Sequence, residues 1–453
     1  NSLAAYINQI GLGSNFGEGS SFDLIEKKFP QSYNVKWHIL PHYFGDNVQI
    51  EDSINKTEKK PNGNKIGHIA LQIITSNDSL FFSNLMIHQN ETPTASRALW
   101  QTPLKAAIHK GPFKVYNHND QSTEIVLQDI AHNLYLVDLE GNIKWSVPLS
   151  GPIMSDIFQV DIFKNNRYQY LFNTRNFLHL IDRNGRYVEG FPMRLPSPAT
   201  AGIAVFDYDN NKDYRILFPS EDRRIYNYTL NRRPVTGWYY NKSAHIIESP
   251  LQHIRLDGRD YIFAIDNQGN LEILNRRGMP GINPSPRLKV NAAARVFAGT
   301  IADDPHFVVA GDRGELNLIR PNGSIEKFAP DTFSHHHQFV YSDIIPDREM
   351  EMVYLDDGIL SLRNFSQRLL FSIPLSGNEK SHLSIVNLED KGNLISVIDL
   401  ERKLIFMVDI TGRLVAPFPV SGNKAFFFDR NRDNNWTFVT GIDNMLVCYQ
   451  IDL

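Results

Sequence analysis

The stretch "NLYLVDLEGNIKWSVPLSGP", residues 133–152, decides the fold. Apolar and polar residues alternate in "NLYLVD" and again in "IKWSVP", and alternation with period two indicates half-buried β-strands. Gly141 lies between the two segments and supplies the positive φ that a tight hairpin turn requires. The stretch therefore predicts an antiparallel hairpin whose second strand carries Trp145 and ends at Pro148.

The polar residue that ends the first strand of this hairpin recurs at intervals of 43 to 49 residues. The recurring positions are Asp138, Asp182, Asn231, Asn275, Arg320, Asn364, Asp409 and Asp452. A period near 45 residues, built from short strands and polar turns, predicts a β-propeller with one four-stranded antiparallel blade per repeat. We expect an all-β, eight-bladed ring, and a seven-bladed ring is the alternative if the degenerate 331–377 repeat is inserted differently.

The two ends of the repeat region complement each other. Residues 97–112, "RALWQTPLKAAIHKGP", match the outer strand of the repeat without a preceding hairpin, and the eighth repeat stops at Leu453 before its own outer strand. We predict that strand 97–104 completes the last blade and that the propeller spans residues 96–453, which leaves no free sheet edge at the closure.

Residues 1–95 do not carry the period. "SSFDLIEKKFP" (20–30) has helical spacing, residues 51–65 form a charged loop, and "HIALQIITSNDSLFFSNLMI" (68–87) predicts a hairpin. We interpret this region as a small α+β segment, the end of a larger domain.

Composition excludes several classes of function. With 46 basic against 50 acidic residues, and no basic run, the chain has no electrostatic footprint for nucleic acid. No stretch reaches the roughly 18 apolar residues of a membrane span, although a chain that begins with Asn1 leaves room for an upstream anchor. The single cysteine, Cys448, lies in an alternating strand, so it indicates a buried apolar residue and excludes a disulfide or cysteine-based metal site within the chain.

Two acidic loops have the spacing of calcium ligands. In "FDYDNNKDYRIL" (206–217) the residues at positions 1, 3 and 5 are Asp207, Asp209 and Asn211, and "FDRNRDNNWTFV" (428–439) repeats the design with Asp429, Asn431 and Asp433. The first loop resembles the calcium loops of integrin-type propeller blades, but it has Lys212 and Arg215 where that pattern has glycine and a carboxylate. The alternative, which we favour for both loops, is a structural turn whose polar side chains cap backbone N–H groups.

Other candidates are weaker. His335 and His337 of "SHHHQF" would share one face of a strand and could bind a metal with Asp343, or all three histidines, His336 included, are exposed polar residues. The innermost strands that we identify begin mostly with small or apolar residues, which predicts a narrow, filled channel; these positions are Ser155-Asp156, Ala204, Pro250, Ala293 and Ser384. The aromatic residues of "GWYYNK" (237–242) are either partner anchors or blade packing.

The segment "LYLVDLEGNIKW" resembles the quinoprotein-like repeat, and the resemblance covers about residues 97–453. That family includes pyrroloquinoline-quinone dehydrogenases and non-catalytic propellers of the bacterial envelope, such as the outer-membrane assembly lipoprotein. The dehydrogenases usually carry an adjacent cysteine pair and repeated docking tryptophans, whereas this chain has one cysteine and five tryptophans. The resemblance therefore implies a protein without catalytic residues or a bound cofactor, located in the periplasm or cell envelope.

Taken together, the sequence predicts a non-catalytic scaffold that binds a protein partner in the bacterial envelope. The alternative is a propeller that binds calcium, a glycan or a small molecule in its central channel, and a quinoprotein-type oxidoreductase is less favoured.

Overall fold

The computed structural model describes residues 34–39, 66–75, 81–89 and 98–451, apart from 293, 302–303, 312, 329–332, 346–348, 376–380, 389–390 and 432. The chain divides into two units, Asn1–Thr94 and Ala95–Leu453. In the first unit an antiparallel sheet has the order β1-β2-β3, with β1 Asn34–Ile39, β2 Ile66–Thr75 and β3 Phe81–Gln89. The predicted hairpin corresponds to β2 and β3, β1 was not predicted, and the predicted helix and charged loop lie outside the described residues.

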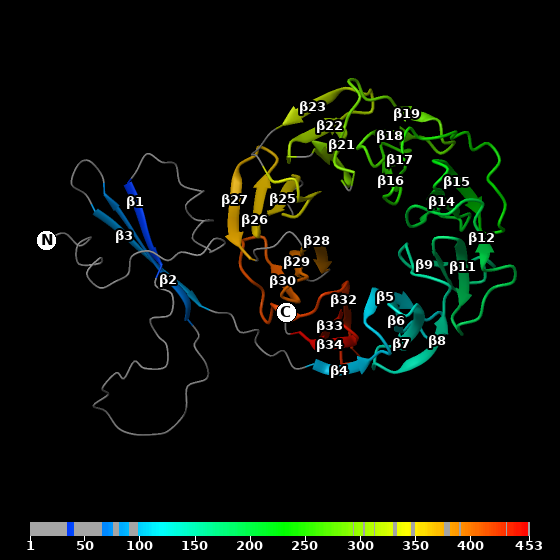
Figure 1. Ribbon diagram of the computed structural model, residues 1–453, viewed down its shortest axis with the longest axis horizontal. Coiled ribbons are helices and arrows are strands. Elements are labelled where there is room, and N and C mark those ends of the chain that lie inside the picture. Colours follow the sequence, from blue (N-terminus) through cyan, green and yellow to red (C-terminus); the bar gives the residue numbers. More distant parts are fainter. Residues whose placement is uncertain are drawn as a thin grey trace. The chain divides into compact units, whose positions relative to one another are not determined.

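The second unit is a ring of eight antiparallel sheets, so the prediction of eight blades is confirmed and the seven-bladed alternative is wrong (Figure 1). Blade 1 contains β5 Ile108–Tyr116, β6 Thr123–Asp129, β7 Asn133–Asp138 and β8 Ile143–Pro148, and blade 2 contains β9 Phe158–Val160, β10 Gln169–Asn173, β11 Phe177–Asp182 and β12 Met193–Arg194. Blade 3 contains β13 Ala204–Phe206, β14 Arg215–Pro219 and β15 Ile225–Thr229, and blade 4 contains β16 Gln252–Leu256, β17 Arg259–Ile265, β18 Leu271–Leu274 and β19 Pro280–Ile282. Blade 5 contains β20 Val296–Ile301, β21 Asp304–Ala310, β22 Leu316–Ile319 and β23 Ile325–Phe328, and blade 6 contains β24 Gln338–Ser342, β25 Glu351–Asp356, β26 Ile359–Asn364 and β27 Leu369–Pro374. Blade 7 contains β28 Ser381–Leu388, β29 Gly392–Asp399, β30 Leu404–Val408 and β31 Val420–Ser421, and blade 8 contains β32 Phe426–Arg430, β33 Trp436–Ile442, β34 Met445–Gln450 and β4 Ala98–Pro103.

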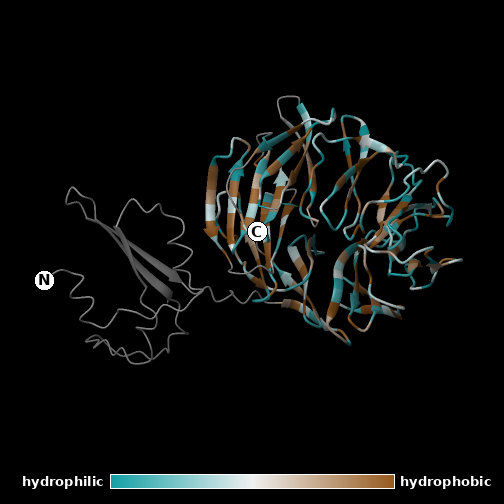
Figure 2. Ribbon diagram, turned by 45° about the horizontal axis from the view of Figure 1, so that its top comes forward, coloured by the Kyte–Doolittle hydropathy of each residue, from teal (hydrophilic) through white to brown (hydrophobic). Residues whose placement is uncertain are grey.

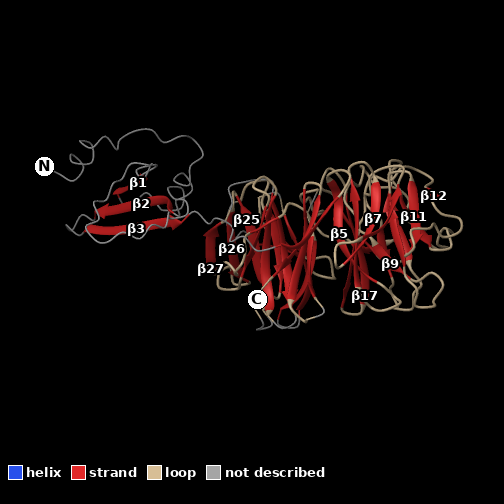
Figure 3. Cartoon of the chain, turned by 90° about the horizontal axis from the view of Figure 1, so that it is seen from below, coloured by secondary structure: helices blue, strands red, loops and turns tan. Residues whose placement is uncertain are grey.

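Blade 8 joins the two ends of the propeller. Its outer strand β4 pairs with β34, and Trp100 lies opposite Cys448 in the register. The ring is therefore closed by hydrogen bonds within one sheet. Figure 3 shows the strands crossing the thickness of the ring, with loops on both faces. None of the described residues forms a helix that could cross a membrane.

The core lies between neighbouring blades. All seven residues of β6 are buried, whereas the residues of β8 are exposed or half-buried. Apolar colour accordingly follows the strands in Figure 2 and polar colour follows the loops. Each fully buried large side chain, such as Phe172 or Leu127, contributes about 1.5–3 kcal/mol through burial, so the middle strands supply most of the hydrophobic stabilisation.

The recurring polar residue closes the turn between the third and fourth strands. In blade 1 the N–H of Gly141 donates to the carbonyl oxygen of Asp138 at 3.0 Å, and the N–H of Asn142 donates to Asp138 Oδ1 at 2.7 Å. Blade 3 differs from the sequence prediction, because the residue in this position is Thr229, two residues before Asn231. The irregular segment that follows β15 misled the alignment of that repeat.

At several junctions a tryptophan of one blade packs on the turn glycine of the next. A Cβ atom at Gly141 would lie 2.8 Å from the indole of Trp100, and one at Gly185 would lie 3.0 Å from that of Trp145. The indole N–H of Trp145 also donates to the carbonyl oxygen of Arg183 at 2.8 Å. The tryptophan of one blade thus covers the turn of the next, and its role is packing.

Candidate functional site

The first acidic loop is held together by its own side chains. Asp207 accepts hydrogen bonds from the backbone N–H groups of Asn211 at 3.0 Å and Lys212 at 2.8 Å. Asp209 accepts from the guanidinium of Arg276 at 3.0 Å, and the side chain of Asn211 caps the N–H of Asp213 at 2.9 Å. The three candidate calcium ligands therefore have separate partners, as the alternative structural turn requires.

The second acidic loop differs at its first residue. Asn431 Oδ1 accepts from the N–H groups of Asp433 at 3.0 Å and Asn435 at 2.9 Å, whereas Asp429 pairs with Lys114 at 3.3 Å. The other oxygen of Asp429, Oδ2, is buried without a hydrogen-bond partner in the described part of the chain. Within those residues no three His, Cys, Asp or Glu side chains are grouped to hold a metal, and calcium at either loop stays a prediction.

Two of the three consecutive histidines belong to a turn. The N–H of His336 donates to Ser334 Oγ at 3.2 Å, and His337 Nδ1 donates to the carbonyl oxygen of Ser334 at 2.6 Å. The His337 ring also lies 5.7 Å from the Phe333 ring, so its position is fixed by packing.

The aromatic residues at 238–240 divide between the two interpretations. Trp238 donates its indole N–H to the carbonyl oxygen of Ile225 at 2.8 Å, and Tyr240 donates to Glu272 at 2.9 Å, so both are packing residues. Tyr239 is 57% exposed, and the Arg277 guanidinium lies 4.8 Å from its ring centroid.

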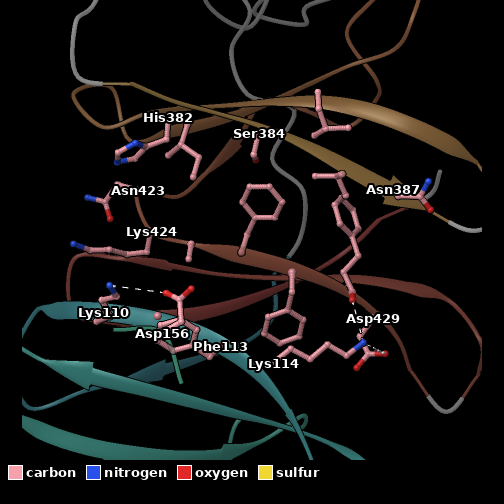
Figure 4. Close-up of a pocket in the computed structure, with 18 of the residues that line it drawn as sticks. Lys110, Phe113, Lys114, Asp156, His382, Ser384, Asn387, Asn423, Lys424 and Asp429 are labelled. Atoms are coloured by element: carbon pink, nitrogen blue, oxygen red, sulfur yellow. Dashed lines mark hydrogen bonds and ion pairs between the residues drawn. The ribbon is translucent and has the colours of Figure 1, made fainter. Parts of the chain in front are cut away.

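A cavity of about 1220 Å³ lies among the inner strands β5, β28 and β32 (Figure 4). The expectation of a narrow, filled channel is therefore wrong on this side of the ring. That expectation rested on small residues of the inner strands, one of which, Ser384 of β28, lines the cavity, but Phe113, Phe426 and Phe428 also line this wall together with long cationic side chains.

Positive charge predominates in the cavity. Among the described lining residues five are cationic and two are carboxylates, namely Lys110, Lys114, Arg295, Lys424 and Arg430 against Asp156 and Asp429. Lys110 donates to the carbonyl oxygen of Met154 at 3.1 Å and lies 4.0 Å from Asp156.

Lys424 is the cation of this set that is both half-buried and without a partner. No hydrogen bond or ion pair to its ammonium occurs within the described part of the chain. Burial lowers its pKa, the Asp443 carboxylate opposes this effect, and the nearby Lys403 adds to it. Partial desolvation also lowers the pKa of His109 and of His382, although both side chains are open to the cavity. The neighbourhood of Lys424 therefore favours an anion.

Sequence reasoning missed the cationic residues of the cavity, although it named Asp429 as a calcium candidate and Asp156 and Ser384 as residues of inner strands. The available signal was the segment "IHKGPFKVY", where histidine and lysine interrupt an inner strand, together with Lys424 before the next inner strand. Since Lys110 and Lys424 are 314 residues apart in the sequence, only the closed ring brings them to one cavity.

No known protein-family profile matches the chain, and no curated protein matches it in sequence. Among solved structures, Sqt1 of Saccharomyces cerevisiae is similar with a TM-score of 0.56 at 9% identity, over 79% of this chain and 100% of that one. The dihydro-heme d1 dehydrogenase NirN matches with a TM-score of 0.50 at 12% identity, over 78% of this chain and 71% of that one. BamB from Moraxella catarrhalis matches with a TM-score of 0.48 at 13% identity, over 78% of this chain and 99% of that one. The matches to Sqt1 and NirN show the propeller fold alone, and this fold also occurs in an enzyme.

Proposed function

We propose that this chain is a non-catalytic scaffold whose propeller binds a protein partner at the outer edge of blade 3. The observation that carries the proposal is the exposed Tyr239–Arg277 pair, at the place where the fourth strand of the blade is missing.

Blade 3 has three strands, so β15 forms the edge of its sheet. An irregular segment follows this edge instead of a strand: the N–H of Val235 donates to the carbonyl oxygen of Asn227 at 2.9 Å, and Trp238 covers Ile225. The segment then places Tyr239 outward, held by a hydrogen bond of 2.8 Å from its N–H to the carbonyl oxygen of Arg277.

Such a departure from the repeat favours a functional role. A regular fourth strand would pair the edge of the sheet more completely, and natural proteins break a local rule most often at functional sites. Tyrosine and arginine are enriched among residues that dominate binding energy, because both present large, amphipathic surfaces. The backbone contact to Arg277 holds the pair in place before a partner binds, which lowers the entropic cost of association.

Affinity purification of the full-length chain from its native cells tests this proposal. We expect a stoichiometric protein partner that is lost with the double variant Tyr239→Ser and Arg277→Ser. The matched control is Phe163→Ser, which removes an aromatic side chain of 61% exposure from a loop of the four-stranded blade 2. A partner that binds both variants equally, or the absence of any stoichiometric partner, would contradict the proposal.

The proposal includes a location in the bacterial cell envelope or periplasm. Its support is the resemblance of "LYLVDLEGNIKW" to the quinoprotein-like repeat, whose non-catalytic members include propellers of the bacterial envelope. Fractionation of cells that express the natural gene tests the location, and recovery in the cytosolic fraction would argue against it.

A further inference from the structure

The three strands around the cavity share one order of side chains. On β5, Lys110 comes first, Phe113 follows and Lys114 comes near the end. On the β32 side, Lys424 precedes the strand, Phe426 and Phe428 follow, and Asp429 is near the end.

On β28 the order is the same: His382 comes near the start, Ile385 and Val386 lie in the middle, and Asn387 comes near the end. Every blade begins with its inner strand, so the inner strands run in the same direction across the ring. The cavity consequently has two polar ends and an apolar middle.

The two polar ends differ in how their charges are satisfied. At one end Lys114 pairs with Asp429, and Arg430 lies over the Trp436 ring with 4.2 Å between the guanidinium carbon and the ring centroid. At the other end Lys424 has no partner among the described residues. The ammonium of Lys110 lies 4.0 Å from the exposed Asp156 carboxylate, which is a long distance for an ion pair. Figure 4 shows Lys110, Lys424, His382 and Asn423 together at this end.

We propose that the cavity binds an amphipathic anion, with a carboxylate or phosphate head between Lys110 and Lys424 and an apolar body along the phenylalanines. The proposal is independent of the partner site on blade 3.

Three properties of the site select this class of ligand. An anionic head gives the half-buried Lys424 a charge-assisted hydrogen bond that it otherwise lacks. The side chain of Asn423 adds hydrogen-bonding groups beside the lysine. The apolar wall buries a hydrocarbon chain, at about 25 cal/mol per Å² of apolar surface removed from water. A small inorganic anion would leave that wall unused, and a cationic amphiphile would meet uncompensated lysines.

Isothermal titration calorimetry with the full-length chain tests the proposal at pH 7 and low salt. The probes are dodecanoate and dodecyl phosphate below their micelle-forming concentrations, with dodecyltrimethylammonium, acetate and inorganic phosphate for comparison. We expect both amphipathic anions to bind at one site, and acetate and phosphate to bind at least about tenfold more weakly. Dodecyltrimethylammonium is expected not to bind.

Charge-removing variants locate the head group. Lys424→Met should weaken both amphipathic anions by about tenfold or more, because it removes a charge-assisted hydrogen bond while preserving the length of the side chain. Lys110→Met should weaken them less, since Asp156 already compensates part of its charge. The matched control, Lys242→Met, changes an exposed lysine outside the cavity and should leave affinity unchanged.

Several results would overturn the proposal. Failure of both amphipathic anions to bind excludes the site, and equal binding of the cationic amphiphile reduces it to non-specific apolar contact. Unchanged affinity in Lys424→Met, with a circular dichroism spectrum like that of the wild type, places the head group elsewhere. If only dodecyl phosphate binds, or only dodecanoate, the ligand class narrows to that head group.

Discussion

Trp145 at the junction of blades 1 and 2 and Lys424 in the cavity wall are both half-buried, yet their surroundings are opposite. Trp145 packs against Gly185 and donates its N–H to the carbonyl oxygen of Arg183. Lys424 has no hydrogen-bond or ion-pair partner among the described residues. The repeat thus serves two purposes. Side chains that pack and hydrogen-bond with each other hold neighbouring blades together, and a polar side chain without a hydrogen-bond partner is available to a ligand. Variants at junctions should therefore change stability, and variants in the cavity should change binding.

The largest expected effect on stability is at the junction. Trp145→Ala removes a large packed ring and its hydrogen bond and should lower the free energy of unfolding by about 3 kcal/mol. Urea unfolding followed by circular dichroism measures the change, and Trp145→Phe should recover part of it by restoring a ring. Binding of dodecanoate to the folded variant should equal that of the wild type. If the Trp145→Ala protein were as stable as the wild type, the claim that junction residues determine stability would be wrong.

The pH dependence of stability extends the comparison between a blade interior and the cavity to two histidines. His179 in blade 2 is buried, stacks on Phe172 at 4.9 Å, and contacts Thr174 and Tyr187, whereas His382 is open to the cavity. Burial lowers the pKa of His179 to about 4. The unfolded chain, with an ordinary histidine pKa near 6.5, takes up this proton first, so the native state is least stable in acid.

The His179 contribution is absent above pH 6.5 and grows as the pH falls toward 4, where it reduces stability by about 3 kcal/mol. Unfolding midpoints measured between pH 7 and 4 should show this loss, and His179→Gln should flatten the slope over that interval. His382→Gln should flatten the slope less, because desolvation also lowers the pKa of His382 but its side chain is exposed whereas that of His179 is buried. Equal effects of the two substitutions would show that exposure to the cavity does not distinguish them.

The first acidic loop, residues 206–217, offers a smaller effect. Asp207→Ala removes the acceptor of two backbone N–H groups and should cost about 1–2 kcal/mol, as the loss of a helix cap does. Because those hydrogen bonds already use both oxygens, we expect the cost to be the same with calcium and with a chelator. The thermal unfolding midpoint under the two conditions measures it. A wild-type midpoint that rises with calcium and a variant midpoint that does not would instead establish a metal site at Asp207.

The ring was predictable because its signals are local. Alternation within "NLYLVD", the glycine turn and the spacing of residues such as Asp138 and Asp182 are all present in short stretches. The prediction failed where one repeat departs from the others, so that Asn231 was taken for the residue that the structure identifies as Thr229. The interpretation of Cys448 as a buried apolar residue is confirmed, since it is 1% exposed on β34.

The cavity was not predictable in the same way. Whether an inner strand fills a channel or borders a cavity depends on the distance between strands from different blades, and the period contains no such distance. Lys110 and Lys424 are individually ordinary residues at strand starts. Their significance comes from closure of the ring, which joins the beginning and the end of the propeller in blade 8.

The smallest expected effect on stability belongs to Lys424 itself. Lys424→Met should change the free energy of unfolding by no more than about 0.5 kcal/mol, because the ammonium has no partner among the described residues and the lysine stem is replaced by an apolar chain. A slight gain is the expected direction, since burial disfavours the charged form in the native state. Thermal unfolding of the variant beside the wild type measures this change, and the same samples with dodecanoate measure the ligand's contribution. Ligand should raise the midpoint of the wild type and leave that of Lys424→Met nearly fixed. A variant that is clearly less stable than the wild type without ligand would show that Lys424 stabilises the fold, as the residues at the blade junctions do.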